Sequence, residues 1–465
     1  MNRLLVTAWL LLWPCLLWAQ QPQEGAGSGQ DQQGQVEINP DVTTQARVAV
    51  ADFVARTSAN RATEEAAETF NRVLWDDLEF SARFEMPSKS FYPLRPIRNA
   101  SDVSFEDWQV PTLDVDYLAF GNIQVDVNGT VLEAFLYDVG TREQIIGQRY
   151  RLTRTEQIRR SAHAFADQVV FNLTAGASRG VAQTQIAFTS EKGGSKEIYV
   201  VDYDGFNERT ITANDGLNKF PDWSNENRYL AFVTNLPGSA RWELWVQDLE
   251  GASGRQVIQV PTTYVSSPSF SPDGSRLALS ARAVDKSDPD VFIADIERAL
   301  SGQGGGSRLR NLTNHPSIDT APTWSPTGRQ LAFISDRSGT PQIWMMDADG
   351  SNLRRLTQDG GHCDSPDWSP DGRRIAFSWQ APRQWKHDIF IIDVATGVTN
   401  QVTSGRGSAE NPHWSPDGRH LVFQSTRTGS KQIFIVNVDG ENLKQITAYG
   451  INENPAWSGY RSLER

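Results

Sequence analysis

One short motif recurs along the second part of the chain and constrains the fold more than any other feature. It reads Pro-x-Trp-Ser or Pro-x-Phe-Ser, and several copies continue with Pro-Asp-Gly. Its aromatic residue stands at Trp223, Phe270, Trp324, Trp368, Trp414 and Trp457, so consecutive copies lie 43 to 54 residues apart. A period of this length, with about four short strands per repeat, is typical of the blades of a β-propeller.

Each repeat carries two further signatures between copies of the motif. A β-rich run ends in an acidic turn, as in Ile343–Gly350 and Ile433–Gly440, and an aliphatic residue followed by threonine closes the unit, as in Leu356-Thr357. The first set of strands, from Ile186, lacks a preceding motif, and the last motif, at Pro455, has no blade after it. The sequence therefore predicts a six-bladed propeller over residues 181–465, closed where the C-terminus joins the first blade. We expect the motif aromatics to pack between blades and Ser-Pro-Asp-Gly to form turns.

The region before the repeats has a different pattern. Alternating apolar residues predict strands, and apolar residues at helical spacing predict helices. The expected strands span residues 47–54, 117–127, 131–139 and 145–152, and the expected helices span residues 63–78 and 157–173. The fold class is thus an α/β N-terminal domain, residues 36–175, plus an all-β six-bladed β-propeller.

The first 35 residues are expected to lie outside both domains. Residues 1–19 combine Arg3, an apolar run and Ala19, which is typical of a secretory signal peptide. Residues 20–35 are Gln, Gly and Ser with little to bury, and are predicted to be a flexible tether. Removal of the signal peptide leaves Cys363 as the one cysteine, so no intramolecular disulfide is possible.

The net charge of the chain limits the classes of partner that it is expected to bind. Its formal net charge is −12, with 44 basic and 56 acidic residues. Nucleic-acid binding requires a basic face for the phosphates, so nucleic acid is not an expected partner. No cofactor or metal is expected from the motifs.

The blade geometry points to one face as the binding surface. If each motif aromatic lies on the innermost strand, the residues just before each motif proline ring one mouth of the central channel. We expect them on the connections that enter those strands, and they differ between copies while the framework repeats. The candidate partner-binding residues among them are Phe220, Tyr264, Ser267, Thr320, Ala321, Asp364 and Glu410.

The motifs and the order of the two domains together resemble the TolB family of the Tol–Pal system. The resemblance covers about residues 36–460 and includes the run Ile198–Gly205 and the ending Pro455-Ala456-Trp457-Ser458. It implies a monomeric, non-enzymatic periplasmic adaptor, which serves outer-membrane integrity and constriction at cell division. The propeller mouth would bind the peptidoglycan-associated lipoprotein Pal. An N-terminal segment, here Val36, Glu37 and Ile38, would contact the inner-membrane protein TolA.

Two other kinds of protein that contain a propeller are alternatives to the adaptor. A peptidase of the prolyl-oligopeptidase type needs a nucleophile elbow, and the sequence has no Gly-x-Ser-x-Gly. A propeller that binds or cleaves a carbohydrate with a metal in its channel would need ligands at the mouth. His315, His362 and His413 are the candidates for such a cluster, although no spacing motif for metal ligands accompanies them.

Overall fold

The computed structural model describes residues 45–460, except residues 57–60, 128, 155, 252–253, 259–261, 285, 297–308 and 359. The predicted signal peptide, the tether and the segment Val36, Glu37 and Ile38 lie outside the described residues. No helix within these described ranges is long and apolar enough to cross a membrane.

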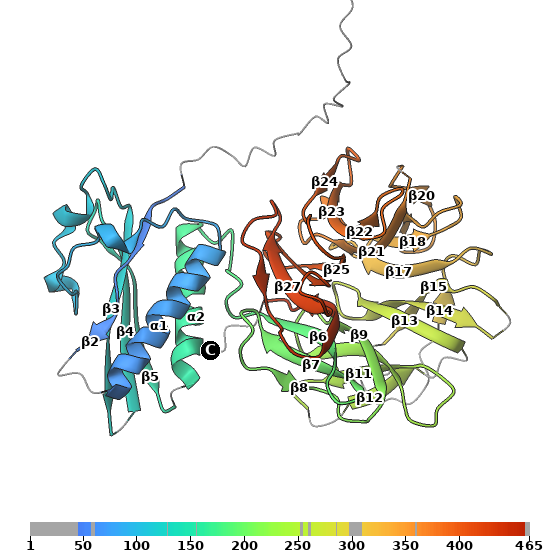
Figure 1. The fold of residues 1–465 in the computed structure, drawn as a ribbon, viewed down its shortest axis with the longest axis horizontal. Helices are drawn as coiled ribbons and strands as arrows, with labels where there is room; N and C mark the ends of the chain where they lie inside the picture. Colours follow the sequence, from blue (N-terminus) through green and yellow to red (C-terminus); the bar gives the residue numbers. More distant parts are fainter. Residues whose placement is uncertain are drawn as a thin grey trace, which may run out of the picture. The chain divides into compact units, whose positions relative to one another are not determined.

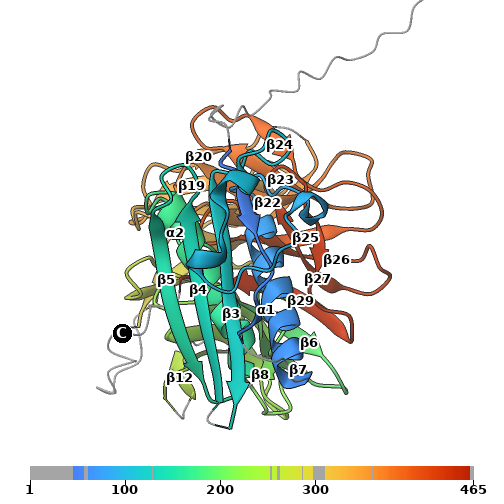
Figure 2. The ribbon, with the colours of Figure 1, turned by 90° about the vertical axis from the view of Figure 1, so that its left-hand side faces the viewer.

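The amino-terminal domain is built on a mixed sheet. Its strands are β1 (Val48–Val50), β2 (Val54–Ala55), β3 (Tyr117–Asp126), β4 (Gly129–Asp138) and β5 (Gln144–Leu152). The order is β1-β3-β4-β5, and β1 and β2 both pair with β3 in parallel, whereas β3, β4 and β5 form an antiparallel meander. Figure 2 looks onto this sheet, with β3, β4 and β5 side by side.

Two helices cover one face of that sheet, α1 (Arg61–Phe80) and α2 (Glu156–Leu173), and both predicted helices are thereby confirmed (Figure 1). Their apolar residues recur at helical spacing, and in α1 Phe70, Leu74 and Leu78 are fully buried. Three short 3₁₀ turns line the connection from α1 to β3: η1 (Lys89–Phe91), η2 (Ala100–Asp102) and η3 (Phe105–Trp108).

The rest of the described chain forms six four-stranded blades (Figure 1). Blade one takes β29 (Ile451–Trp457) as its innermost strand, followed outward by β6 (Gln185–Glu191), β7 (Lys196–Asp202) and β8 (Arg209–Thr210). The antiparallel pairing of β29 with β6 closes the ring as predicted. The other five blades each run from an innermost to an outermost strand in chain order. They comprise β9 (Leu217–Trp223), β10 (Tyr229–Asn235), β11 (Glu243–Asp248) and β12 (Gly254–Ile258); β13 (Thr262–Phe270), β14 (Arg276–Ala283), β15 (Asp290–Asp295) and β16 (Leu309–Asn311); β17 (Asp319–Trp324), β18 (Gln330–Ser335), β19 (Gln342–Asp347) and β20 (Arg354–Arg355); β21 (His362–Trp368), β22 (Arg374–Gln380), β23 (Asp388–Asp393) and β24 (Thr399–Gln401); and β25 (Ala409–Trp414), β26 (His420–Ser425), β27 (Gln432–Asn437) and β28 (Lys444–Gln445).

The motif aromatics end the innermost strands and are buried between blades. Trp414 is 3% exposed, and its indole Nε1 donates to the carbonyl oxygen of Asp367 in the preceding blade at 3.1 Å. Trp324 donates in the same way to Ser269. These anchors contribute apolar burial and satisfy the indole N–H across the seam between two blades, whereas Trp368 donates to Gly372 in the turn of its own blade.

The other repeated residues also have structural roles. The hydroxyl of the closing threonine accepts an N–H near the start of the third strand of the blade, as Thr447 does from Ile433, the second residue of β27, at 2.9 Å. In the turn after the anchor, Ser415 Oγ donates to Asp417 at 2.6 Å, and Gly418 adopts φ +68°, a conformation that favours glycine. These turns lie at the opposite end of the innermost strands from the proline-preceding residues, as predicted.

A buried polar junction joins the amino-terminal domain to the propeller, and both belong to one compact unit. His163 of α2 lies between two carboxylates, with Nδ1 at 2.7 Å from Asp77 of α1 and Nε2 at 3.2 Å from Asp204 of the propeller. The hydroxyl of Tyr203 donates to Asp77, and Arg159 pairs with Asp204. Beside this network, Phe80 of α1 stacks on His420 of β26 with ring centroids 4.3 Å apart.

Candidate partner-binding mouth of the propeller

The residue before each motif proline has an unusual backbone conformation. Its φ is positive in all six copies, between +49° and +55°, although none of the six is glycine. The residues are Phe220, Ser267, Ala321, Ser365, Asn411 and Asn454. Each lies at a register shift between the innermost strand and its neighbour, which is the mark of a β-bulge.

The structure corrects one part of the sequence prediction. The proline-preceding residues were expected on connections that enter the innermost strands, but they lie within strands β9, β13, β17, β21, β25 and β29. The bulge explains the difference, because proline donates no N–H and the ladder must be interrupted there. Neighbouring side chains take up part of the lost pairing: Ser280 Oγ accepts from the N–H of Ala321 at 2.9 Å, and Ser378 Oγ from that of Asn411 at 3.0 Å.

The six bulge residues and their prolines surround one cavity of about 120 Å³, which we call the mouth cavity. Positive φ turns these side chains out of the regular alternation of the strand. The predicted residues Phe220, Ser267 and Ala321 are thus brought together by the fold. The six copies share one backbone geometry but carry four different residue types, Phe, Ser, Ala and Asn, so the cavity has a constant backbone frame and a variable lining.

The mouth cavity ends at a layer of polar side chains contributed by the variable residue of five of the six motifs, since the sixth has Ala456 at this position. Asp222, Asp367 and His413 line both the mouth cavity and a second cavity of about 360 Å³ on the side of the motif aromatics. His413 lies between the two carboxylates, with Nε2 at 3.7 Å from Asp222 and Nδ1 at 3.7 Å from Asp367. We call these three residues the channel layer.

Charge and backbone contacts hold the channel layer in place. Burial lowers the pKa of His413, but the carboxylates of Asp367 and Asp222 outweigh burial and raise this pKa to about 9. Asp222 accepts the backbone N–H of Phe270, and Asp367 accepts that of Trp414, both at 2.7 Å. The ion pairs of the layer therefore also tie neighbouring blades together.

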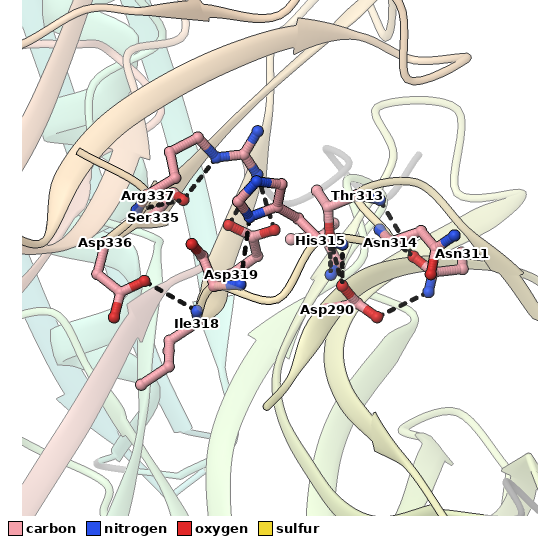
Figure 3. A network of polar contacts seen from close by, with 12 residues as sticks. Asp290, Asn311, Thr313, Asn314, His315, Ile318, Asp319, Ser335, Asp336 and Arg337 are labelled. Atoms are coloured by element: carbon pink, nitrogen blue, oxygen red, sulfur yellow. Dashed lines mark hydrogen bonds and ion pairs between the residues drawn. The ribbon is translucent and has the colours of Figure 1, made fainter. Parts of the chain in front are cut away.

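The rim outside the cavity carries several ion pairs, and Figure 3 shows those at blades three and four. Arg337 donates to both oxygens of Asp319 at 2.9 and 2.8 Å and to Ser335 Oγ at 2.8 Å. Asp290 accepts the backbone N–H of His315 at 3.1 Å. In this part of the rim the charged groups are satisfied within the protein.

A second group of ion pairs lies where blade six meets blades one and two. Glu453 lies within ion-pair distance of three lysines: Lys196 at 2.5 Å, Lys219 at 3.4 Å and Lys431 at 3.6 Å. Burial raises the pKa of Glu453, but the lysines outweigh it and the pKa is lowered.

The remaining predicted residues lie on the rim and do not line the mouth cavity. Thr320 and Tyr264 are half-buried within β17 and β13, and Asp364 is exposed in β21. Glu410 accepts from Gln424 Nε2 at 2.9 Å and lies 3.7 Å from His387 Nδ1. The fold therefore places these four residues beside the cavity, on the same face.

Sequence reasoning misses the channel layer and most of the rim ion pairs. The sequence does contain a signal for the channel layer. The residue between proline and tryptophan varies within an otherwise constant motif, and the residues before the proline vary in the same way. The three histidines considered as metal ligands are not gathered into one site, since His413 lies in the channel wall while His315 and His362 lie on the rim. Within the described ranges, no group of three His, Cys, Asp or Glu side chains is arranged to hold a metal ion.

Models of two protein families match most of the chain. The TolB amino-terminal domain matches residues 34–145, and the TolB beta propeller domain matches residues 172–380 and 359–462. The Tol-Pal system protein TolB of Bordetella pertussis is 30% identical over 345 residues, which cover 73% of this chain and 70% of that protein. This chain belongs to the TolB family. The protein of the same name from Desulfosudis oleivorans is 30% identical over 313 residues, 67% of this chain and 64% of its own.

The fold agrees with that assignment. The crystal structure of TolB from Acinetobacter baumannii aligns with a TM-score of 0.72 and 23% identity, covering 90% of this chain and 98% of that one. The predicted family and the predicted fold class are thus confirmed. As a member of the TolB family, the chain is a non-enzymatic protein with a role in the Tol–Pal system.

Proposed function

We propose that this protein is a periplasmic adaptor that binds a Pal-like peptidoglycan-associated lipoprotein through the propeller mouth. The observation that carries the proposal is the mouth cavity, where six bulges with nearly the same positive φ present four different residue types around one opening. A fixed scaffold with a variable lining is what a recognition surface requires. In this role the protein serves outer-membrane integrity and the constriction of the envelope at cell division.

The mouth face has the size and the residue types of a protein interface. A stable interface buries about 1,600 Å² in total, and we expect a partner that covers the rim of several blades to bury an area of this order. Aromatic residues are enriched among binding hot spots, and Phe220 and Tyr264 are the aromatic members of the predicted set. Phe220 also packs on the seam between blades two and three, so its stability has to be measured together with its binding.

The second contact of the adaptor is proposed for the N-terminal segment Val36, Glu37 and Ile38, which would bind a TolA-like inner-membrane protein. The support is the resemblance to the TolB family and the position of the segment after a Gln, Gly and Ser-rich stretch. Such a stretch lets a short segment reach a partner away from the body of the protein.

A pull-down from the envelope of the native host tests the lipoprotein contact. The bait is the mature chain, residues 20–465, and the captured proteins are identified by mass spectrometry. We expect a Pal-like lipoprotein with the unaltered bait, and roughly tenfold weaker binding for Phe220→Ala and for Tyr264→Ala. Phe91→Ala is the matched control, because Phe91 is 60% exposed on η1 of the amino-terminal domain. Normal binding by both mouth variants would reject the mouth as the site, and capture of no envelope protein would reject the adaptor function.

The same bait tests the second contact separately. Replacing Val36 and Ile38 by aspartate is expected to abolish recovery of the TolA-like protein while the lipoprotein is still captured. Loss of both partners, or of neither, would contradict the assignment of the segment.

A further inference from the structure

Four neighbouring loops lie on the mouth face beside the cavity. They span residues 381–387, 404–408, 426–431 and 449–450, on blades five, six and one. Hydrogen bonds link them in series: His387 N donates to Ser408 Oγ at 3.1 Å, Ser408 N to Thr426 Oγ1 at 2.9 Å, and Asn452 N, at the start of β29, to the carbonyl oxygen of Lys431 at 3.0 Å. We call these four loops the docking sector.

Two large aromatic side chains stand exposed on the docking sector. Trp385 is 80% exposed and Tyr449 is 83% exposed. An exposed tryptophan leaves a large apolar surface in contact with water. Burial of aromatic side chains contributes much of the binding energy of interfaces. Exposed aromatics on the face that carries the mouth cavity indicate a surface that a partner covers.

Two arginines occupy equivalent positions in blades four and six. Arg337 of blade four and Arg427 of blade six each lie near two aromatic rings, 5.7 and 5.1 Å from the centroids of Phe333 and Trp344 in one case and 5.5 and 5.2 Å from those of Phe423 and Phe434 in the other. Each donates its Nε to a serine at the end of the second strand, at 2.8 Å to Ser335 and at 3.2 Å to Ser425. The two guanidinium groups are therefore held in the same way.

Only Arg337 has an internal carboxylate. Asp319 pairs with Ser335 across β17 and β18, and the residue that pairs with Ser425 across β25 and β26 is Ala409. Within the described residues, Arg427 makes no ion pair. Asp388, the acidic residue that acts on it electrostatically, is held by Lys386 at 2.6 Å.

Arg406, on the adjoining loop, strengthens the contrast between the two blades. It is exposed and has no ion pair among the described residues. The residue before the arginine also differs: in blade four it is Asp336, whose carboxylate accepts the N–H of Ile318 at 2.9 Å, and in blade six it is the uncharged Thr426, whose hydroxyl accepts the N–H of Ser408 at 2.9 Å. The rim at blade six thus presents two guanidinium groups that make no ion pair among the described residues, whereas at blade four Asp319 pairs with Arg337.

The geometry points to the docking sector as the place where the mouth-bound protein partner inserts an Asp or Glu carboxylate against Arg427, with an apolar side chain of the same partner covering Trp385. This inference rests on the proposed function and specifies the chemistry of the partner surface. A guanidinium fixed by a serine and two rings presents its remaining N–H groups as a fork, which matches a carboxylate in a bidentate geometry. Arginine and tryptophan together are the residue types enriched at binding hot spots.

Titration calorimetry with the purified soluble domain of the Pal-like lipoprotein tests this inference on the mature chain, residues 20–465. Arg427→Gln and Trp385→Ala are each expected to weaken binding roughly 30-fold. Arg427→Lys is expected to recover part of the loss, because lysine keeps the charge without the fork. Arg354→Gln is the matched control: it removes the same charge from the exposed outermost strand of blade four, and its affinity is expected to stay within about twofold.

The internal comparison supplies a second variant. Ala409→Asp gives Arg427 the carboxylate that Asp319 gives Arg337, so it is expected to compete with the partner and weaken binding while Arg427 remains in place. Ala409 is buried, so the melting temperature of this variant is measured first; if it does not fold, Arg427→Gln decides the question.

The outcomes separate the two proposals. Binding of the unaltered chain with unchanged affinity in Arg427→Gln and Trp385→Ala would overturn the docking sector and leave the lipoprotein contact standing. Absence of binding by the unaltered chain would overturn the proposed function and the docking sector with it.

Discussion

The seams between blades and the junction between the two domains are both buried, but they are built from opposite chemistry. A seam is mainly apolar: an aromatic anchor such as Trp414 is buried, and its indole and backbone N–H groups donate to Asp367 of the preceding blade. The junction is ionic, with His163 between Asp77 and Asp204 and with Arg159 on the outer side of Asp204. The energy of a seam therefore comes mainly from removing apolar surface from water, whereas that of the junction depends on the protonation of its members.

This difference has a consequence for how the protein responds to its surroundings. The burial of an aromatic anchor does not change with pH, so the apolar part of each seam is unaffected by pH. Buried ion pairs stabilise only while both partners stay charged and hydrogen-bonded. The attachment of the amino-terminal domain is thus expected to depend on pH more than the aromatic anchors do.

The largest effect is expected at a seam. Trp414→Ala should lower the free energy of unfolding by about 3–5 kcal/mol, since it removes a large buried side chain and leaves a cavity between blades. Trp385→Ala is the control, because it is the same substitution at a residue that is 80% exposed. Chemical denaturation of both variants measures the difference. Equal stabilities would show that the motif aromatics do not anchor the blades.

At the junction, Asp77→Ala should destabilise the protein by about 3 kcal/mol, because it leaves His163 and the hydroxyl of Tyr203 buried without their shared acceptor. Asp76→Ala, one residue earlier on α1 and exposed, is expected to change stability by no more than about 0.5 kcal/mol. Urea denaturation followed by fluorescence compares the two. A loss in Asp76→Ala as large as that in Asp77→Ala would contradict the assigned role of the network.

The contrast also explains which parts of the structure the sequence predicts. The motif aromatic occurs six times at intervals of 43 to 54 residues, and most copies are accompanied by a turn and a closing threonine, so repetition reveals the blades, the anchors and the closure by β29. The junction occurs once. Asp77, His163, Tyr203 and Asp204 are spread over more than a hundred residues, and no spacing rule connects them.

The candidate site lies between these cases. Repetition identifies the residues before the motif prolines as a group, and Phe220, Ser267 and Ala321 do share one cavity. Repetition does not reveal that these residues lie on bulges inside strands, because the type of a non-glycine residue does not identify a positive φ. Repetition also does not predict a role for Arg427. That role follows only from comparing Arg427 with Arg337, which pairs with Asp319 in blade four.

A pH profile tests the ionic character of the junction. Burial lowers the pKa of His163, but Asp77 and Asp204 outweigh it and raise the pKa to about 10, against an ordinary value of 6.5. Because the folded pKa is the higher one, the stabilisation by His163 is complete below about pH 6.5 and is lost as the pH rises toward 10. The stability difference between the unaltered protein and His163→Gln should therefore shrink over this range, by on the order of 2 kcal/mol. The measurement is thermal denaturation between about pH 6 and about pH 10, a range that spans the ordinary pKa of histidine and the raised pKa of His163. A difference that stays constant over this range would exclude a charged His163.

The smallest effect separates the hydrogen bond of Tyr203 from its ring. Tyr203→Phe keeps the fully buried ring beside Phe80, with centroids 5.5 Å apart, and removes only the hydroxyl that donates to Asp77. Asp77 still faces His163, so the carboxylate keeps one charged partner and the expected loss is about 1 kcal/mol. If the loss approached that of Asp77→Ala, the hydroxyl and not the imidazole would be the main partner of Asp77, and the pH dependence at His163 should then be weak. The two measurements together therefore decide whether the junction is held by charge or by a neutral hydrogen bond.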